Sequence, residues 1–402
     1  MSFPKGLSLS QAPPFIVVSG FFITACLLWF LGSLLEIYAL LTNRLSIPLL
    51  THITTVGFAL FTMFGALFQM LPVVAGAVIQ KPKQKAFISW ILLLTGYLLL
   101  LFGFYLSSFS ALFAGASLLF TGIAYTSLLM LNRLMRIKSY TPTSQGIKFA
   151  LLFVLIGGFF GFLTSLSYGG YIDNTEIFLK VHRLFMLFGW IFLLITSVSF
   201  QVVEMFFVTR AYPRLYAMNF PYLLTFALIF SLFEFKLSNL PLSMLVFFQA
   251  LITLHRLFTR KRKIADKSLY FWYLSHIHLL IAVILLVFDG FNYRFLFVFF
   301  LFFSTLITGM MLRIIPFLVW FHLSNEGSLK VPLMSEVIDQ KLINLCLLLS
   351  FALSLSVYLL PIIGPALITA FMHSSLSFLL SYSVIKGSFL YFRLSPLYNP
   401  SK

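Results

Sequence analysis

Histidine and acidic side chains are scarce in this sequence, so the few that fall inside apolar stretches are the first candidates for chemistry. The chain has 7 His and 10 Asp or Glu among its 402 residues. His52 and His182 stand at the heads of two long apolar segments, and His373 lies within a third. Ionisable groups inside a membrane segment are expensive and mark functional sites, and neutral imidazole is a common ligand of haem iron and copper. We predict His52, His182 and His373 as cofactor ligands, with His52 and His182 as the metal ligands; the alternative is a headgroup-level or helix-packing histidine.

A second group of polar residues lies inside apolar segments and forms the remaining candidates: Glu36, Gln69, Gln201, Glu204, Glu234, His276, His278 and Arg313. His276 and His278 are two residues apart, so on a helix they point to different sides and cannot easily chelate one ion together. Glu204 and Arg313 hold matching places in two similar segments, which favours an ion pair between them. A proton relay through Glu36 or Glu204 is the alternative.

The elements that carry these residues are predicted to be membrane-spanning helices. The composition is 61% hydrophobic and 9% charged, whereas soluble domains are about a quarter charged. A spanning helix needs about 20 mostly apolar residues. Twelve segments qualify, at 15–42, 49–79, 86–107, 109–132, 147–169, 177–208, 219–235, 240–259, 268–288, 294–323, 340–360 and 363–387. The whole chain, 1–402, is therefore predicted to be one all-α, polytopic transmembrane domain.

Basic residues indicate the orientation of the spans. Lys and Arg gather in the loops after the second, fourth, sixth and eighth predicted spans, including 81–85, 133–138, 210–214 and 260–263. Cytoplasmic loops hold the excess of positive charge. We expect a multi-pass protein of the inner (cytoplasmic) membrane with both termini in the cytoplasm. The net charge of +17 serves this topology, so the expected partner is the lipid bilayer and not nucleic acid.

Three similar octapeptides indicate an internal repeat. Residues 65–72, 197–204 and 309–316 align with Gln69, Gln201 and Arg313 in the same place. They fall in the second, sixth and tenth predicted spans, which is a period of four. We predict a pseudo-threefold bundle with repeat-like units at about 15–132, 147–259 and 268–387. The alternative is that small and polar residues at these places only mark helix packing.

His52 leading into the 63–76 segment, together with twelve spans in a period of four, resembles subunit I of the haem–copper oxidases (cytochrome c oxidase subunit I). The resemblance implies haem bound by His52, copper bound by His182, respiratory or other membrane subunits as partners, and a role in respiration or nitric-oxide responses. Several family features are absent: His182 is followed by Arg183 and Leu184 instead of Pro and Glu, and residues 219–235 contain no histidine. The ligand set for oxygen reduction is incomplete, so we expect a haem- and/or copper-binding protein and not a complete terminal oxidase.

Two other functions stay open. A cofactor-free transporter or channel with twelve helices is the first, and its best candidate for a broken helix is the glycine cluster Gly157, Gly158 and Gly161. An active terminal oxidase or nitric-oxide reductase is the second, and it requires unexpected residues to replace the missing ligands.

Overall fold

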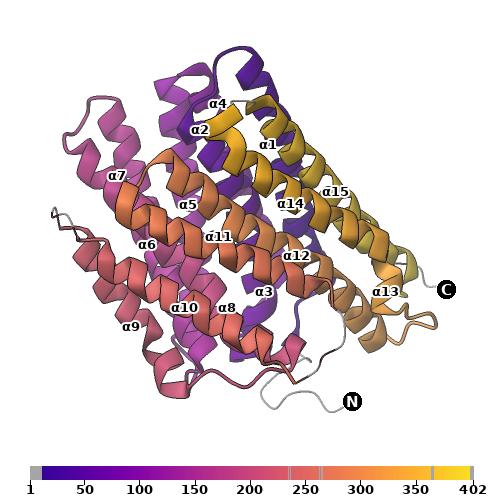
Figure 1. The fold of residues 1–402 in the computed structure, drawn as a ribbon. Helices are drawn as coiled ribbons and strands as arrows, with labels where there is room; N and C mark the ends of the chain where they lie inside the picture. The colour runs from indigo at the N-terminus through magenta and orange to yellow at the C-terminus, as the bar shows by residue number, and fades with distance from the viewer. Residues whose placement is uncertain are drawn as a thin grey trace. The chain divides into compact units, whose positions relative to one another are not determined.

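The computed structural model describes residues 11–233, 235, 237–261, 263, 266–363 and 366–398. Glu234 lies outside them. The elements are all helical (Figure 1), and their bounds are α1 Phe15–Leu41, α2 Ile47–His52, η2 Ile53–Leu60, α3 Phe61–Ala75, α4 Pro82–Leu106, α5 Phe109–Leu134, α6 Pro142–Tyr168, α7 Thr175–Leu184, η3 Phe185–Phe192, α8 Leu193–Phe207, α9 Arg214–Ser231, α10 Leu240–Phe258, α11 Ser268–Asp289, α12 Tyr293–Asn325, α13 Met334–Val337, α14 Gln340–Ile363 and α15 Ala366–Leu394.

Eleven of the described helical segments are long and apolar enough to cross a membrane. This confirms the predicted all-helical, multi-pass membrane protein, and the predicted span 15–42 matches α1 almost residue for residue. The segment predicted at 219–235 corresponds to α9, which is not among the eleven. Its first half carries Arg214, Asn219 and Pro221, and these residues lower its hydropathy.

The described chain forms two compact units, each assembled from segments far apart in the sequence. The first unit consists mainly of Ala66–Ile264 and Leu279–Leu296, and the second of Pro14–Gly65, Ala265–His278 and Phe297–Lys402. In the first unit α4 packs on α5, and α6 packs on α5, α7, η3 and α8. In the second unit α1 packs on α15 and η2, and α14 packs on α15.

Glycines set the close approach of α4 and α5. A Cβ atom added at Gly96 would lie 2.3 Å from the backbone nitrogen of Leu119, and one added at Gly115 would lie 2.3 Å from that of Leu100. Small residues at such contacts let the backbones of membrane helices approach closely. The hairpin therefore depends on glycine at both places.

α6 is continuous from Pro142 to Tyr168. The expected break at Gly157, Gly158 and Gly161 was wrong, because these glycines make room for neighbouring side chains instead of interrupting the helix. A Cβ at Gly157 would lie 2.8 Å from the sulfur of Met186, and one at Gly161 would lie 2.6 Å from Nδ1 of His182.

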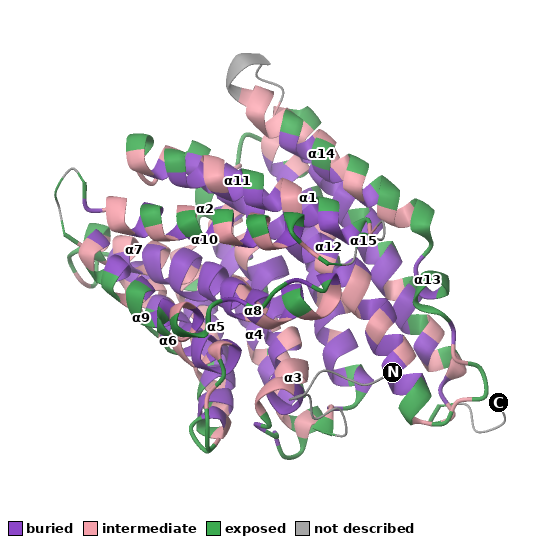
Figure 2. Cartoon of the chain, turned by 60° about the horizontal axis from the view of Figure 1, so that its bottom comes forward, coloured by how far each residue is buried: buried purple, intermediate pink, exposed green. Residues whose placement is uncertain are grey.

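The helices differ in the share of their residues that is buried. In an apolar 18-residue stretch of α12, 89% of the residues are buried, whereas the share in the corresponding stretch of α14 is 22%. Figure 2 shows α14 coloured largely by exposed and intermediate residues along its length. An apolar helix with little protein around it is suited to contact with lipid, and α12 is suited to carry interior groups.

Candidate functional site

The first and last long helices of the second unit are joined by a buried carboxylate–imidazole pair. Nδ1 of His373, on α15, lies 2.7 Å from Oε2 of Glu36, on α1. The exposed fractions are 6% for Glu36 and 7% for His373. An isolated charge here would be expensive, whereas one proton shared by the two groups leaves the pair neutral overall. Each group therefore gives the other a hydrogen-bond partner in this apolar surrounding.

Trp29 fixes one side of this pair. Its ring stacks on Phe58 at a centroid distance of 4.0 Å and meets the edge of the His373 ring at 5.2 Å. Trp29 is 1% exposed, and its indole nitrogen has no hydrogen-bond partner among the described residues. A buried indole N–H usually finds an acceptor, so this donor is available to a water or a ligand.

A cavity of about 110 Å³ lies beside the pair, entirely within the second unit. Its lining is mostly apolar and comes from α1, the α2–η2 region, α12, α14 and α15; the polar members are Trp29, Glu36, Thr54, Ser304, Thr369 and His373. One water needs about 10–15 Å³ of such volume, and a cavity of about 150 Å³ holds benzene. The space suits a cluster of waters or one small molecule.

His52 ends α2, directly before the π-helical segment η2. Its Nδ1 lies 2.7 Å from the carbonyl oxygen of Pro48. α2 begins at Ile47 because the side chain of Ser46 accepts a hydrogen bond from the backbone N–H of Leu49. With the proton on Nδ1, the ring donates to the carbonyl and carries its lone pair on Nε2, the arrangement found in metal-bound imidazoles.

His182, in the first unit, also has its Nδ1 at hydrogen-bond distance from a backbone carbonyl oxygen. Its Nδ1 lies 2.8 Å from the carbonyl oxygen of Gly157, on α6. The ring packs against Gly161, where a Cβ atom would lie 2.6 Å from Nδ1. His182 is thus held by a neighbouring helix, whereas His52 is held by the preceding turn of its own helix.

The two histidine-bearing segments share an unusual backbone. η2 and η3 are π-helices of eight residues, and each runs directly into an α-helix of fifteen residues, α3 or α8. Gln69 and Gln201 are each the ninth residue of the α-helix that follows. In this register His52 matches Leu184, so the two histidines are offset by two residues. π-helical turns are rare and occur frequently at functional sites.

The close histidine pair on α11 is engaged in hydrogen bonds. Nδ1 of His278 lies 2.6 Å from the hydroxyl of Tyr358, and its Nε2 lies 2.9 Å from Oγ of Ser354. Nδ1 of His276 lies 2.9 Å from the carbonyl oxygen of Trp272. Both ring nitrogens of His278 are occupied, so this residue joins α11 to α14.

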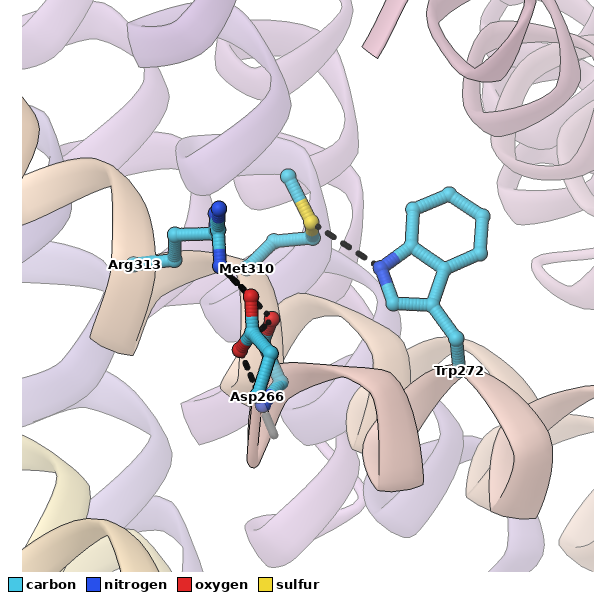
Figure 3. A network of polar contacts seen from close by, with 5 residues as sticks. Asp266, Trp272, Met310 and Arg313 are labelled. Atoms are coloured by element: carbon cyan, nitrogen blue, oxygen red, sulfur yellow. Dashed lines mark hydrogen bonds and ion pairs between the residues drawn. The ribbon is translucent and has the colours of Figure 1, made fainter. Parts of the chain in front are cut away.

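Arg313 forms an ion pair with Asp266, just before α11, and donates to Oγ of Ser268 at 3.1 Å. Figure 3 shows this contact beside a second link, from Nε1 of Trp272 to the sulfur of Met310 at 3.3 Å. Both partners of the ion pair have side chains 27% exposed, so the pair is partly solvated. Glu204 is exposed on α8, and its pairing with Arg313 stays a prediction.

A metal centre with three or more His, Cys, Asp or Glu ligands is not preassembled in the described part of the chain. An ion held by the protein alone needs several such side chains to converge. Haem iron takes four ligands from the macrocycle and needs only one or two imidazoles from the protein.

A polar cluster at the other end of the second unit has no counterpart among the residues predicted from the sequence. Glu326, the residue after α12, accepts hydrogen bonds from the hydroxyl of Tyr391 and from Oγ of Ser395, each at 2.6 Å. Serine spaced by four or seven residues along 377–395 was the available signal, because this spacing places hydroxyls on one helix face.

No known protein family has a model that matches this chain, and no curated protein matches it significantly. The functional assignment therefore depends on the residues described above.

Proposed function

We propose that this chain is a haem-binding integral membrane protein with a bundle like that of haem–copper oxidase subunit I. The proposal rests mainly on two segments of equal element lengths, η2–α3 and η3–α8. Each follows a histidine whose Nδ1 lies at hydrogen-bond distance from a backbone carbonyl oxygen. Equal lengths in both segments support the predicted repeat in the second and sixth spans. The matching part of α12 is α-helical throughout, so this support covers two of the three predicted copies.

His52 would hold a haem in the second unit, and His182 would hold a haem or copper in the first. A bound haem supplies redox chemistry or binds a diatomic gas, and the protein positions it and excludes water. Copper at His182 needs further ligands, and it is the weaker part of the proposal because no three-ligand cluster is preassembled in the described residues. Such a protein would act in respiration, metal handling or nitric-oxide defence, alone or with other membrane subunits.

The test is the haem, iron and copper content of protein purified from a haem-replete host. We expect haem in the wild type, loss of at least half of it in His52→Ala or His182→Ala, and no change in His255→Ala, because His255 is exposed at the end of α10. Folded protein without haem, iron or copper would refute the proposal.

A second candidate, a cofactor-free transporter or channel, is favoured by one observation. The buried Glu36–His373 pair lines a cavity large enough for water or a small molecule, and such pairs occur on substrate and proton pathways. Metal-free protein whose transport persists in His52→Ala and His182→Ala variants would support this candidate over the first.

We further propose that the chain lies in the inner membrane with both termini in the cytoplasm. The basic loops support this orientation. Termini on the same side require an even number of spans, so α9 would have to cross the membrane in addition to the eleven described spans. Labelling of single cysteines placed in the 81–85 and 210–214 loops from each side of spheroplasts tests it: both must react only from the cytoplasmic side.

A further inference from the structure

Four contacts set the register of α1 against α15, and each joins one residue of α1 to one of α15: Glu36 to His373, Ser33 to Ser377, Cys26 to Ser381 and Phe15 to Tyr391. Numbers fall on α1 as they rise on α15, so the two helices run antiparallel along their whole lengths. We call the interface between the two helices the seam. The register shows which residue of α1 lies at the same height along the seam as each residue of α15.

The α15 side of the seam carries a row of buried hydroxyl groups, at Ser377, Ser381, Ser388, Tyr391 and Ser395. None of these residues is more than 3% exposed. Ser33 and Ser377 bond to each other across the seam at 3.1 Å, and Ser381 donates to the carbonyl oxygen of Cys26 at 2.8 Å. A hydroxyl can donate and accept at once, so such a row can relay a proton.

Two hydroxyls of this seam lack a partner. Oγ of Ser19 on α1 and Oγ of Ser388 on α15 are both buried, and neither has a hydrogen-bond partner among the described residues. Ser19 lies four residues beyond Phe15, and Ser388 lies three before Tyr391, so the register places them at about the same level. A buried hydroxyl without a partner is destabilising, and a site with several polar groups is where a protein holds an internal water.

Both ends of the row are titratable groups. One end of the row, at the C-terminal end of α15, is Glu326, which is bonded to Tyr391 and Ser395. His322 lies one turn earlier on α12, and its buried Nε2 has no partner in the described part of the chain. The other end of the row, near the N-terminal end of α15, is the Glu36–His373 pair with its cavity. From His373 to Ser395 the helix rises about 33 Å at 1.5 Å per residue, close to the roughly 30 Å thickness of the bilayer core.

We propose that the α1–α15 seam is a water-assisted proton path that connects Glu326 with the Glu36–His373 pair. A proton moves along the row as each oxygen gains one hydrogen and passes another on, so one O–H bond forms for each that breaks and no electron is transferred. The longest step, from Ser381 to Ser388, rises about 10 Å, which about three waters span at hydrogen-bond distance. The driving force is a pH difference or a voltage across the membrane. This path requires neither haem nor copper.

The competing explanation is that the serines serve only close helix packing, with their hydroxyls bonded to the preceding turn. Ser381 and Ser377 do make such bonds. Packing alone does not explain two buried hydroxyls without partners at about the same level of the seam, nor a row that ends on carboxylates at both sides.

The test uses the full chain in proteoliposomes loaded with a pH-sensitive dye, with potassium and valinomycin setting the voltage. We expect proton flux above that of protein-free vesicles, reduced at least tenfold in Glu36→Gln, which cannot ionise, and in Ser388→Val, which fills the unpartnered position. Ser375→Val is the matched control, because Ser375 is exposed on the same helix and its flux should be unchanged.

Thermal unfolding of each variant, measured on the same preparations, separates loss of the path from loss of the fold. Wild-type flux equal to that of empty vesicles would overturn the proposal. So would unchanged flux in folded Glu36→Gln and Ser388→Val. Because the readout is proton movement, neither result depends on whether haem is bound.

Discussion

Replacing His373 with alanine tests whether the Glu36–His373 pair is buried as described. The change leaves the Glu36 carboxyl without its partner at a site where the two residues are 6% and 7% exposed. Breaking a buried ion pair by removing one member costs about 3–5 kcal/mol. At 1.4 kcal/mol for each tenfold change, this lowers the folded-to-unfolded ratio by a factor of roughly 100 to 4,000.

The assay is unfolding in mixed micelles with increasing dodecyl sulfate, followed by circular dichroism and tryptophan fluorescence. Ser375→Ala is the control on the same helix and should stay within about 0.5 kcal/mol of wild type. The double variant Glu36→Gln/His373→Ala should be more stable than His373→Ala, because an uncharged amide replaces the stranded carboxyl. A loss of less than about 1 kcal/mol in His373→Ala would refute the reasoning, since it would mean that water reaches the pair.

Three further changes have expected outcomes. Gly115→Ala should destabilise the protein by about 1–3 kcal/mol in the same assay, because the new Cβ would lie 2.3 Å from a backbone nitrogen of α4, whereas Gly20→Ala, with nothing within 4 Å, should be neutral or mildly stabilising; equal effects would contradict the packing. Arg313→Ala should lower stability by no more than about 1 kcal/mol, since its ion pair is partly solvated; a much larger loss would mean that the pair is dry. Gly161→Ala should push the His182 ring from its place and lower the haem content of the purified protein, and an unchanged content would show that the ring position is not needed.

Helix positions were predictable because the membrane imposes a simple rule. Residues 15–42 and 109–132 were recognised from unbroken apolar runs, and the structure ends α1 and α5 within two residues of these limits. The π-helices were not predictable, because π and α segments share the same composition. The spacing of 17 residues from His52 to Gln69 and of 19 from His182 to Gln201 gave only the hint that the two histidines are not equivalent.

The polar interior was only partly predictable. His373 and Glu36 stood out as ionisable groups in apolar segments, but their pairing joins residues 337 apart in the sequence, and only the antiparallel packing of α1 on α15 brings them together. Ser19 and Ser388 carry no signal of their own, since serine is frequent at packed membrane helices. Their importance follows from a register that tertiary structure alone defines.

Haem binding is tested most directly by the oxidised and dithionite-reduced absorption spectra of the detergent-purified protein, recorded for wild type and His52→Ala. We expect a Soret band with reduced-state bands in the wild type, and weakened or shifted bands in His52→Ala. A folded wild-type protein with no Soret band would contradict haem binding.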